Sequence, residues 1–245
     1  MDIEVVGGHD FGRRAADVVC EAVRRQPDII LGLPTGLTPL GMYADLIRRL
    51  TANEVDVGRA TAFAIDELHG VARGQVATNA SYIARTLAGV PLRVDVMDST
   101  APDGDAECVR FAAVIAAAGG LELTIVGIGR NGHLAFNEPG SAFDSRARRV
   151  RLAHTTREPY IDAFGSFEAT PAFGLTLGMA ELLASREVLL LANGSDKASI
   201  VARAFDGPVC EDVPASALQR HANVTALLDR EAAVALSADT KRSDA

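Results

Sequence analysis

Three stretches of this sequence combine carboxylate, imidazole and glycine residues in patterns that suit acid–base chemistry on a small anionic ligand. In the first, the apolar run 62–65 leads directly into Asp66 and Glu67. One of these carboxylates could accept a proton while the other tunes the local field. Because side chains alternate along an extended chain, we expect only one of them to point straight into a cleft. An exposed turn or a helix start is the structural alternative.

The second stretch, VGIGRNGHLAFNEPG at 126–140, follows another apolar run and carries His133 and Glu138. A histidine beside a carboxylate is a usable proton shuttle near neutral pH, since the carboxylate orients the ring and stabilises its charged form. The glycines would let the backbone pass close to a ligand. The letters GIGRNG also match GxGxxG, but Pro139 breaks the following segment and no acid ends a later strand at the ribose-binding distance. We therefore predict no nicotinamide cofactor and, lacking HExxH or similar spacing, no metal.

The third stretch, LPTGLTP at 33–39, joins a predicted strand to a predicted helix. Gly36 permits a tight turn, Thr38 is suited to cap the helix, and Pro39 fits the first helical position. Backbone amides in such a loop, with the positive end of the helix behind them, suit a phosphate group. The loop is not a Walker A motif, because no Gly-Lys-Ser/Thr follows. A capped connection without a ligand is the structural alternative.

The elements that must position these stretches alternate between strand and helix patterns. Continuous apolar runs predict strands at 3–6, 29–33, 61–65, 123–128, 188–192 and 224–228. Helical spacing predicts helices at 11–25, 40–50, around 108–115 and at 195–205, with an alanine-rich helix after the last strand. We therefore predict one α/β domain over residues 1–245, an open and mainly parallel sheet with helices on both faces, as in a Rossmann-like three-layer sandwich. Ligands of such sheets bind beyond the carboxyl ends of the strands, where all three stretches fall.

Composition restricts the partners of the protein. The net charge of −8 argues against nucleic acid, whose phosphates are held by clustered Lys and Arg. The sequence has neither an apolar run of the roughly 20 residues that a membrane span needs nor a signal peptide, so we predict no membrane partner. The cysteines at 20, 108 and 210 are odd in number and far apart, which predicts free thiols and a cytoplasmic location. A homo-oligomer is compatible with the sequence.

Three motifs, in their order along the chain, resemble those of the glucosamine-6-phosphate deaminases: LGLPTGLTPLGMY (31–43), FAIDELHG (63–70) and VGIGRNGHLAFNEPG (126–140). Weaker matches at 81–82, 155–157, 175–178, 194–197 and 214–218 extend the resemblance over nearly the whole chain. The related 6-phosphogluconolactonases share the fold and a Gly-His motif, but typically lack the Asn-Glu-Pro that follows it here. The resemblance implies an enzyme that converts glucosamine 6-phosphate and water to fructose 6-phosphate and ammonia without a cofactor.

The resemblance also implies a role for each matching residue. Asp66 would be the base that moves a proton between C2 and C1 of the open-chain sugar. His133 would open the pyranose ring, with Glu138 as its carboxylate partner. Asn131 stands where family members have Asp or Asn and completes the predicted catalytic set. The predicted substrate-binding residues, most of them around the phosphate, are Thr35, Gly36, Leu37, Thr38, Glu67 and Lys197.

Two departures leave the substrate open. Leu37 replaces the Gly or Ser common in the phosphate loop, and Asp162 falls about where the family has an Arg that clamps the phosphate. An acid in place of a bidentate phosphate ligand is not conservative. A different amino-sugar phosphate, a sugar-phosphate lactonase that keeps His133 but needs no base at C2, and a non-catalytic sugar-phosphate sensor therefore stay as alternatives. Residues 145–172, with Gly and Pro near their ends, are predicted to form an active-site lid.

Overall fold

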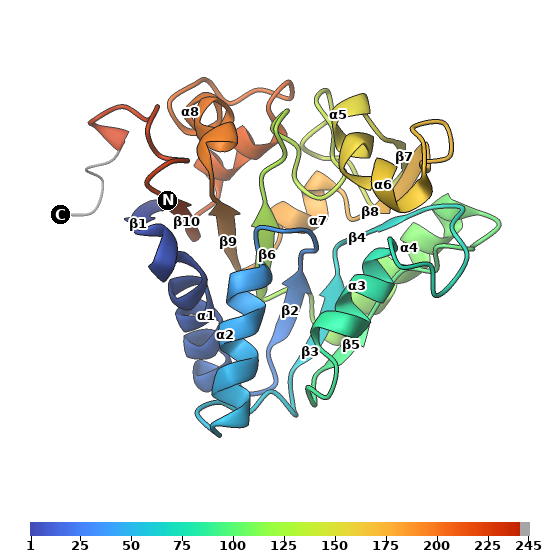
Figure 1. Ribbon diagram of the computed structural model, residues 1–245, viewed down its shortest axis with the longest axis horizontal. Helices are drawn as coiled ribbons and strands as arrows, with labels where there is room; N and C mark the ends of the chain where they lie inside the picture. The colour runs from blue at the N-terminus through green and yellow to red at the C-terminus, as the bar shows by residue number, and fades with distance from the viewer. Residues whose placement is uncertain (241–245) are drawn as a thin grey trace.

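A seven-stranded parallel sheet runs through the centre of the computed structural model, which describes residues 1–240 (Figure 1). The strands in sheet order are β1 (Asp2–Val6), β10 (Val224–Asp229), β9 (Glu187–Ala192), β6 (Leu123–Gly127), β2 (Ile30–Leu33), β3 (Thr61–Ala64) and β5 (Arg93–Asp95). Every neighbouring pair is parallel. The structure confirms the predicted open α/β domain, and six of its strands lie where the apolar runs predicted them. The edge strand β5, with the sequence Arg-Val-Asp, was not predicted, because it contains no apolar run.

Helices cover both faces of this sheet, so its strands are buried on two sides. One face carries α1 (Gly8–Arg25), α2 (Leu40–Thr51) and α3 (Asn79–Thr86). The other carries α4 (Gly104–Ala118), α7 (Met179–Leu183) and α8 (Ala198–Phe205). Neighbouring side chains of a strand enter opposite cores; Leu31 joins the first core and Ile30 the second. This explains why the strands are continuous apolar runs rather than alternating ones.

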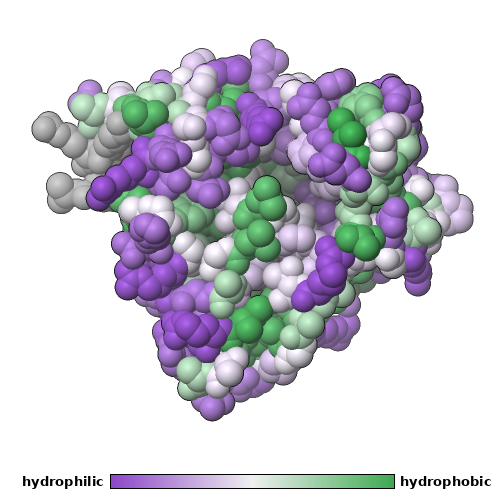
Figure 2. Space-filling view, in the orientation of Figure 1, coloured by the Kyte–Doolittle hydropathy of each residue, from purple (hydrophilic) through white to green (hydrophobic). Residues whose placement is uncertain are grey.

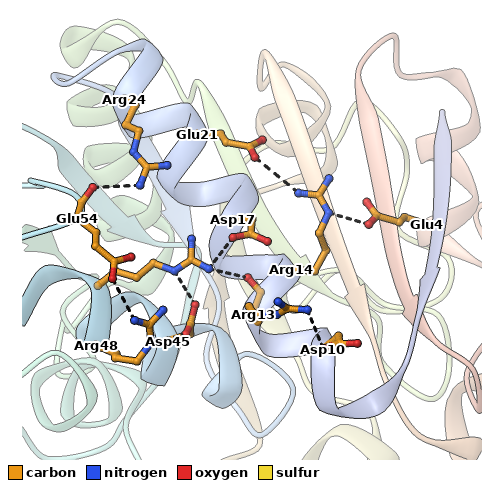
Figure 3. Close-up of polar contacts among 11 residues, drawn as sticks. Glu4, Asp10, Arg13, Arg14, Asp17, Glu21, Arg24, Asp45, Arg48 and Glu54 are labelled. Carbon is orange, nitrogen blue, oxygen red and sulfur yellow. Dashed lines mark hydrogen bonds and ion pairs between the residues drawn. The ribbon is translucent and has the colours of Figure 1, made fainter. Parts of the chain in front are cut away.

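Close packing of α1 on α2 fixes the helix that follows the 33–39 loop. A Cβ on Gly12 would lie 2.6 Å from the carbonyl carbon of Gly41, so the two backbones approach more closely than larger residues would allow. Nearby, the buried Arg49 donates to Asp17 of α1 at 2.5 Å and to Asp45 of its own helix at 2.6 Å (Figure 3). A buried cation needs such partners, because burying it unpaired is costly.

A second, three-stranded antiparallel sheet was not predicted from the sequence. It consists of β4 (Asp66–Leu68), β8 (Phe173–Thr176) and β7 (Arg148–Arg151), in that order. Asp66 pairs with Thr176, and Thr176 also pairs with Arg148. The strands have three or four residues and mostly polar sequences, so neither length nor periodicity identifies them. Asp66 thus begins a strand of its own at the end of β3.

Two helix predictions were wrong. The alanine-rich stretch after β10 forms consecutive turns, because the Asp229 carboxylate accepts the amide of Ala232 and Asp206 binds Ser237, which turns the chain back. Thr38 does not cap α2; Pro39 holds that position, and its side chain offers no capping bond. The first turn is closed instead by the Leu40 amide on the Leu37 carbonyl.

The remaining elements are short and gather at the carboxyl end of the sheet. The helix predicted at 195–205 begins as a 3-10 turn, η2 (Ser195–Lys197). The others are α5 (His154–Arg157), η1 (Glu158–Tyr160), α6 (Ile161–Phe164) and η3 (Pro214–Arg220). Within residues 1–240, no helix has the length and apolar character to span a membrane. All three cysteines are free thiols.

Candidate active site

The strand order places a cleft beyond the carboxyl ends of β2 and β6. From β2 the chain continues to β3 on one side, and from β6 it continues to β9 on the other, so the order reverses between these neighbours. Such a switch point leaves room for a ligand between the two outgoing loops. Figure 2 shows a recess here, between the region of α8 and that of α5 and α6, above the start of α2. All three sequence stretches reach this region.

The loop after β2 presents unbonded amides to the cleft. Gly36 has a φ of +92°, which favours glycine, and Leu37 is 84% exposed. The Tyr43 hydroxyl donates to the Pro34 carbonyl at 2.7 Å, and the Tyr82 hydroxyl donates to the Gly36 carbonyl at 2.7 Å. These bonds fix the carbonyls, whereas no described group accepts the amide hydrogens of residues 36–38. The loop can therefore bind an anion, with the start of α2 behind it.

Asp66 and Glu67 are both buried but point in different directions, as alternation predicts. Glu67 is fully buried, and its carboxylate accepts the amides of Leu68, Asn79 and Ala80 at 2.7 to 2.8 Å. It thereby holds the start of α3, and its predicted contact with a substrate stays a prediction. Asp66 is 8% exposed and accepts a 2.5 Å bond from the Asn79 side-chain amide.

The surroundings of Asp66 suit a base that works near neutral pH. Burial, and next the negative charge of Glu67, raise its pKa to about 7, while the bond from Asn79 acts in the opposite direction. A carboxylate with that pKa is ionised for part of its population at pH 7 and still binds a proton strongly enough to remove one from carbon. Burial likewise raises the pKa of Glu67, against the effect of its backbone bonds.

The loop after β6 brings Asn131, His133 and Glu138 into contact. Asn131 donates through Nδ2 to Oε2 of Glu138 at 2.7 Å and accepts the His133 amide at 3.2 Å. His133 Nδ1 lies 3.6 Å from the same Glu138 oxygen. A Cβ on Gly129 would lie 2.3 to 2.4 Å from three atoms of the imidazole, so this glycine makes room for the His133 ring rather than for a ligand. No described residue bonds Nε2, which stays available to a ligand.

Residues after β7 complete the environment of Glu138. The Ala153 amide donates to Oε1 at 2.9 Å, and the Thr156 hydroxyl lies 3.2 Å from His133 Nδ1. Burial alone would raise the pKa of Glu138, but His133, the Ala153 amide and the Thr156 hydroxyl outweigh it and lower the pKa to about 2. Glu138 is therefore a fixed anion that can orient the imidazole and stabilise its charged form. Thr156 belongs to a weak sequence match, which gave no reason to assign it this contact.

The antiparallel sheet connects Asp66 to the histidine loop. Thr176 lies directly opposite Asp66 in the β4–β8 pair, and its hydroxyl accepts the amide of Phe136, which lies between His133 and Glu138. A Cβ on Gly174 would lie 2.4 Å from the Phe136 ring, so the loop rests directly on the sheet. One strand pair and one hydrogen bond thus connect the backbone of Asp66 to the loop that carries His133 and Glu138.

Lys197 reaches the same region from the strand on the other side of β6. Its ammonium donates to the Ile128 carbonyl at 2.9 Å, at the end of β6. Burial lowers its pKa, and the charge of Arg130 adds to this effect while Asp196 opposes it. Arg130 itself donates to Asp196 at 3.0 Å. The two cations and the open amides of residues 36–38 lie at the ends of β6, β9 and β2, three adjacent strands.

The predicted lid segment, 145–172, contacts the loop of His133 and Glu138 through Ala153 and Thr156. Asp162, on α6, is exposed to solvent. Arg157 cannot replace the missing clamp as it stands, because its guanidinium donates to the carbonyls of residues 167, 170 and 171 and lies 3.9 Å from the Phe167 ring centroid. That this segment moves stays a prediction.

Comparison with known families decides where this chain belongs. The family model for glucosamine-6-phosphate isomerases and 6-phosphogluconolactonase matches residues 8–227. The chain belongs to this family. Among residues 1–240, no group of three or more His, Cys, Asp or Glu side chains is placed to hold a metal ion.

Members of the glucosamine-6-phosphate isomerase and 6-phosphogluconolactonase family resemble this chain over nearly its full length. Glucosamine-6-phosphate deaminase of Pseudarthrobacter chlorophenolicus is 39% identical over 241 residues, which cover 96% of this chain and 93% of the relative. Glucosamine-6-phosphate deaminase 1 of Bacillus subtilis is 36% identical, over 91% of this chain and 94% of the relative. A solved monomeric glucosamine-6-phosphate deaminase superposes with a TM-score of 0.92 at 34% identity, covering 96% of this chain and 100% of that one. The 6-phosphogluconolactonase of Trypanosoma cruzi shares the fold, with a TM-score of 0.79 at 19% identity; the superposition covers 96% of this chain and 97% of that one.

Proposed function

We propose that this protein is an enzyme that converts glucosamine 6-phosphate and water to fructose 6-phosphate and ammonia. The observation that carries the proposal is a buried aspartate, Asp66, with a pKa near 7, whose strand partner Thr176 binds the loop of the Asn131–His133–Glu138 cluster. The 34–39% identity to deaminases over nearly the whole chain supports the same reaction.

The first step is ring opening, for which His133 has the required geometry. Its Nε2 is open to a ligand, while its Nδ1 faces Glu138 and Thr156. The ring moves a proton between the O1 hydroxyl and the ring oxygen O5, so that the C1–O5 bond breaks and C1 becomes an aldehyde. Glu138 supports the imidazolium that forms in this exchange, since its low pKa keeps it anionic.

The second step is proton transfer by Asp66. The carboxylate removes the hydrogen on C2, and the electrons pass to the C1 carbonyl, whose oxygen takes up a proton to give an enolamine. The proton held by Asp66 is then returned to C1, while the C2 amine gives up one proton as the C2–N double bond forms, which replaces the proton taken by O1. C2 is then an imine; water adds to it, the nitrogen leaves as ammonia, and C2 becomes the ketone of fructose 6-phosphate. One base serves both carbons because they are adjacent, and such a base contributes roughly 10² to 10⁴ in rate.

Phosphate binding falls to the amides of residues 36–38 and to Lys197. Thr35 and Thr38, partly exposed in the same loop, add hydroxyl donors. These groups can bind the phosphate without a cation at position 162. Asp162 is exposed on α6 and need not contact the phosphate. We also propose a cytoplasmic site of action, which suits free thiols and a sugar-phosphate substrate.

A panel assay of purified protein tests the proposal and identifies the substrate. Glucosamine 6-phosphate, galactosamine 6-phosphate, mannosamine 6-phosphate and unphosphorylated glucosamine are each supplied, and both ammonia and ketose are measured. We expect equal amounts of ammonia and fructose 6-phosphate from glucosamine 6-phosphate, and little from glucosamine. Hydrolysis of 6-phosphogluconolactone without ammonia release from any amino sugar would replace the proposal with a lactonase. Binding without turnover of any compound would make the protein a sensor.

A further inference from the structure

Tyr160 ends the short helix η1, four residues after the Thr156 hydroxyl that lies beside His133. Its side chain is partly buried and packs against a small apolar cluster formed by Leu68, Val71, Phe136 and Leu152. Leu68 belongs to the strand of Asp66, and Phe136 belongs to the loop of His133. Tyr160 therefore lies over the junction of the two catalytic segments, although no sequence motif pointed to it.

The phenol lies on the Asp66 side of this junction. Side chains alternate along β4, so Asp66 and Leu68 share one face of the strand while Glu67 takes the other. Burial is the main factor that holds the pKa of the Tyr160 phenol well above its usual value, and the negative charges of Asp66 and Glu67 add to it. The hydroxyl thus keeps its proton at any working pH and remains a hydrogen-bond donor.

This hydroxyl has no partner among the described residues, unlike those of the other two tyrosines. Tyr43 and Tyr82 each donate to a carbonyl of the 33–39 loop. Every buried side-chain nitrogen or oxygen that the structure describes has a partner, so the unbonded Tyr160 hydroxyl keeps access to solvent. A partly buried aromatic ring whose hydroxyl has no protein partner is suited to contact a polar ligand.

We infer that Tyr160 is a substrate-contacting residue of the proposed deaminase. Its hydroxyl donates to a sugar oxygen close to the C1–C2 bond, because that bond must lie within reach of Asp66. Its ring excludes water from the Asp66 carboxyl, which favours the protonated form of that group. The inference rests on the proposed function. It adds a residue that favours substrates with an oxygen near the C1–C2 bond, and this residue lies in the segment that departs from the family pattern at Asp162.

The test compares three variants by steady-state ammonia release from glucosamine 6-phosphate between pH 5 and 9. Tyr160→Phe keeps the ring and loses the donor, so we expect kcat/KM to fall roughly 3- to 10-fold with an unchanged acid limb. Tyr160→Ala also admits water to Asp66, so its acid limb should move to lower pH by about half a unit or more. Phe164→Leu is the matched control, because Phe164 packs against the same cluster without a polar tip; its kcat/KM should stay within about twofold of wild type.

Two results would overturn the inference: a Tyr160→Phe enzyme with wild-type kinetics, or a Phe164→Leu enzyme with the same loss as Tyr160→Phe. Failure of the proposed function is recognised separately, by absence of ammonia release from the wild-type protein. In that case calorimetric binding of glucosamine 6-phosphate replaces turnover. Weaker binding by Tyr160→Phe than by wild type then supports the contact, and equal binding or none removes it.

Discussion

Replacing Asp66 by Asn should abolish most of the activity and, at alkaline pH, stabilise the fold. The substitution keeps the size of the side chain and an oxygen that can accept the Asn79 amide, but removes the proton acceptor. We expect kcat/KM for glucosamine 6-phosphate to fall by roughly 10² to 10⁴. In the wild-type enzyme the base must be ionised, so kcat/KM should rise with pH through an acid limb near the pKa of about 7.

The gain in stability follows from the same pKa. Burial raises the pKa of Asp66 from 3.8 to about 7, so the folded state favours the protonated form. The folded protein is therefore unaffected by this group below about pH 4 and loses stability as the pH rises from about 4 to about 7, above which the loss is constant. At roughly 1.4 kcal/mol for each pH unit between the two values, the full loss is about 4 kcal/mol above pH 8 and about 2 kcal/mol at pH 5.

Asn carries no charge at any pH and escapes this loss. Urea unfolding gives the free energy of unfolding of Asp66→Asn and of wild type. We expect the difference in favour of the variant to be about 2 to 3 kcal/mol larger at pH 8 than at pH 5. Ammonia release over the same pH range gives the acid limb. An acid limb near pH 4, or a stability difference that does not grow with pH, would show that Asp66 is not the strongly buried carboxyl described above. A kcat/KM within tenfold of wild type would exclude it as the base.

Three further changes probe the parts that hold the site. Gly129→Ala, whose Cβ would overlap the His133 ring, should lower kcat about 100-fold or more, whereas Gly127→Ala, with no heavy atom within 4 Å of its Cβ, should stay near wild type in the same ammonia assay. Lys197→Ala should raise KM for glucosamine 6-phosphate about tenfold or more and leave KM for any unphosphorylated sugar unchanged in parallel kinetics. Glu67→Gln should destabilise the fold by about 2 to 4 kcal/mol in urea unfolding at pH 7, because an amide nitrogen would face backbone donors at the start of α3.

The parallel sheet and the ends of its strands could be predicted from the sequence, because strands buried on both faces read as unbroken apolar runs. The same pattern placed Asp66 and His133 at the correct edge. The antiparallel sheet could not be predicted, since the sequence of β4 is Asp-Glu-Leu and that of β7 is Arg-Arg-Val-Arg. It forms through pairing with β8, a contact across more than a hundred residues that periodicity does not register.

The contacts that tune the site were likewise beyond local patterns. Asn79 reaches Asp66 only after the chain at 69–78 has folded back onto β4, and Thr156 reaches His133 only from the segment after β7. Glu67 was selected for its adjacency to Asp66 and its charge, and local sequence could not show that its carboxylate accepts three backbone amides. Residue types and strand ends predicted which segments meet at the cleft, whereas the hydrogen bonds of each side chain depend on tertiary contacts that local sequence does not show.

The central claim is that one carboxylate, Asp66, moves a proton at the adjacent carbons C1 and C2 of a hexose phosphate held by the His133 loop. Deuterium exchange tests it most directly: fructose 6-phosphate is incubated with the enzyme and ammonium in D₂O, and the C1 hydrogens are followed by NMR. A base on one face of the sugar should exchange one of the two C1 hydrogens, and Asp66→Asn should stop this exchange. No exchange by the wild-type enzyme, or equal exchange by Asp66→Asn, would contradict the account.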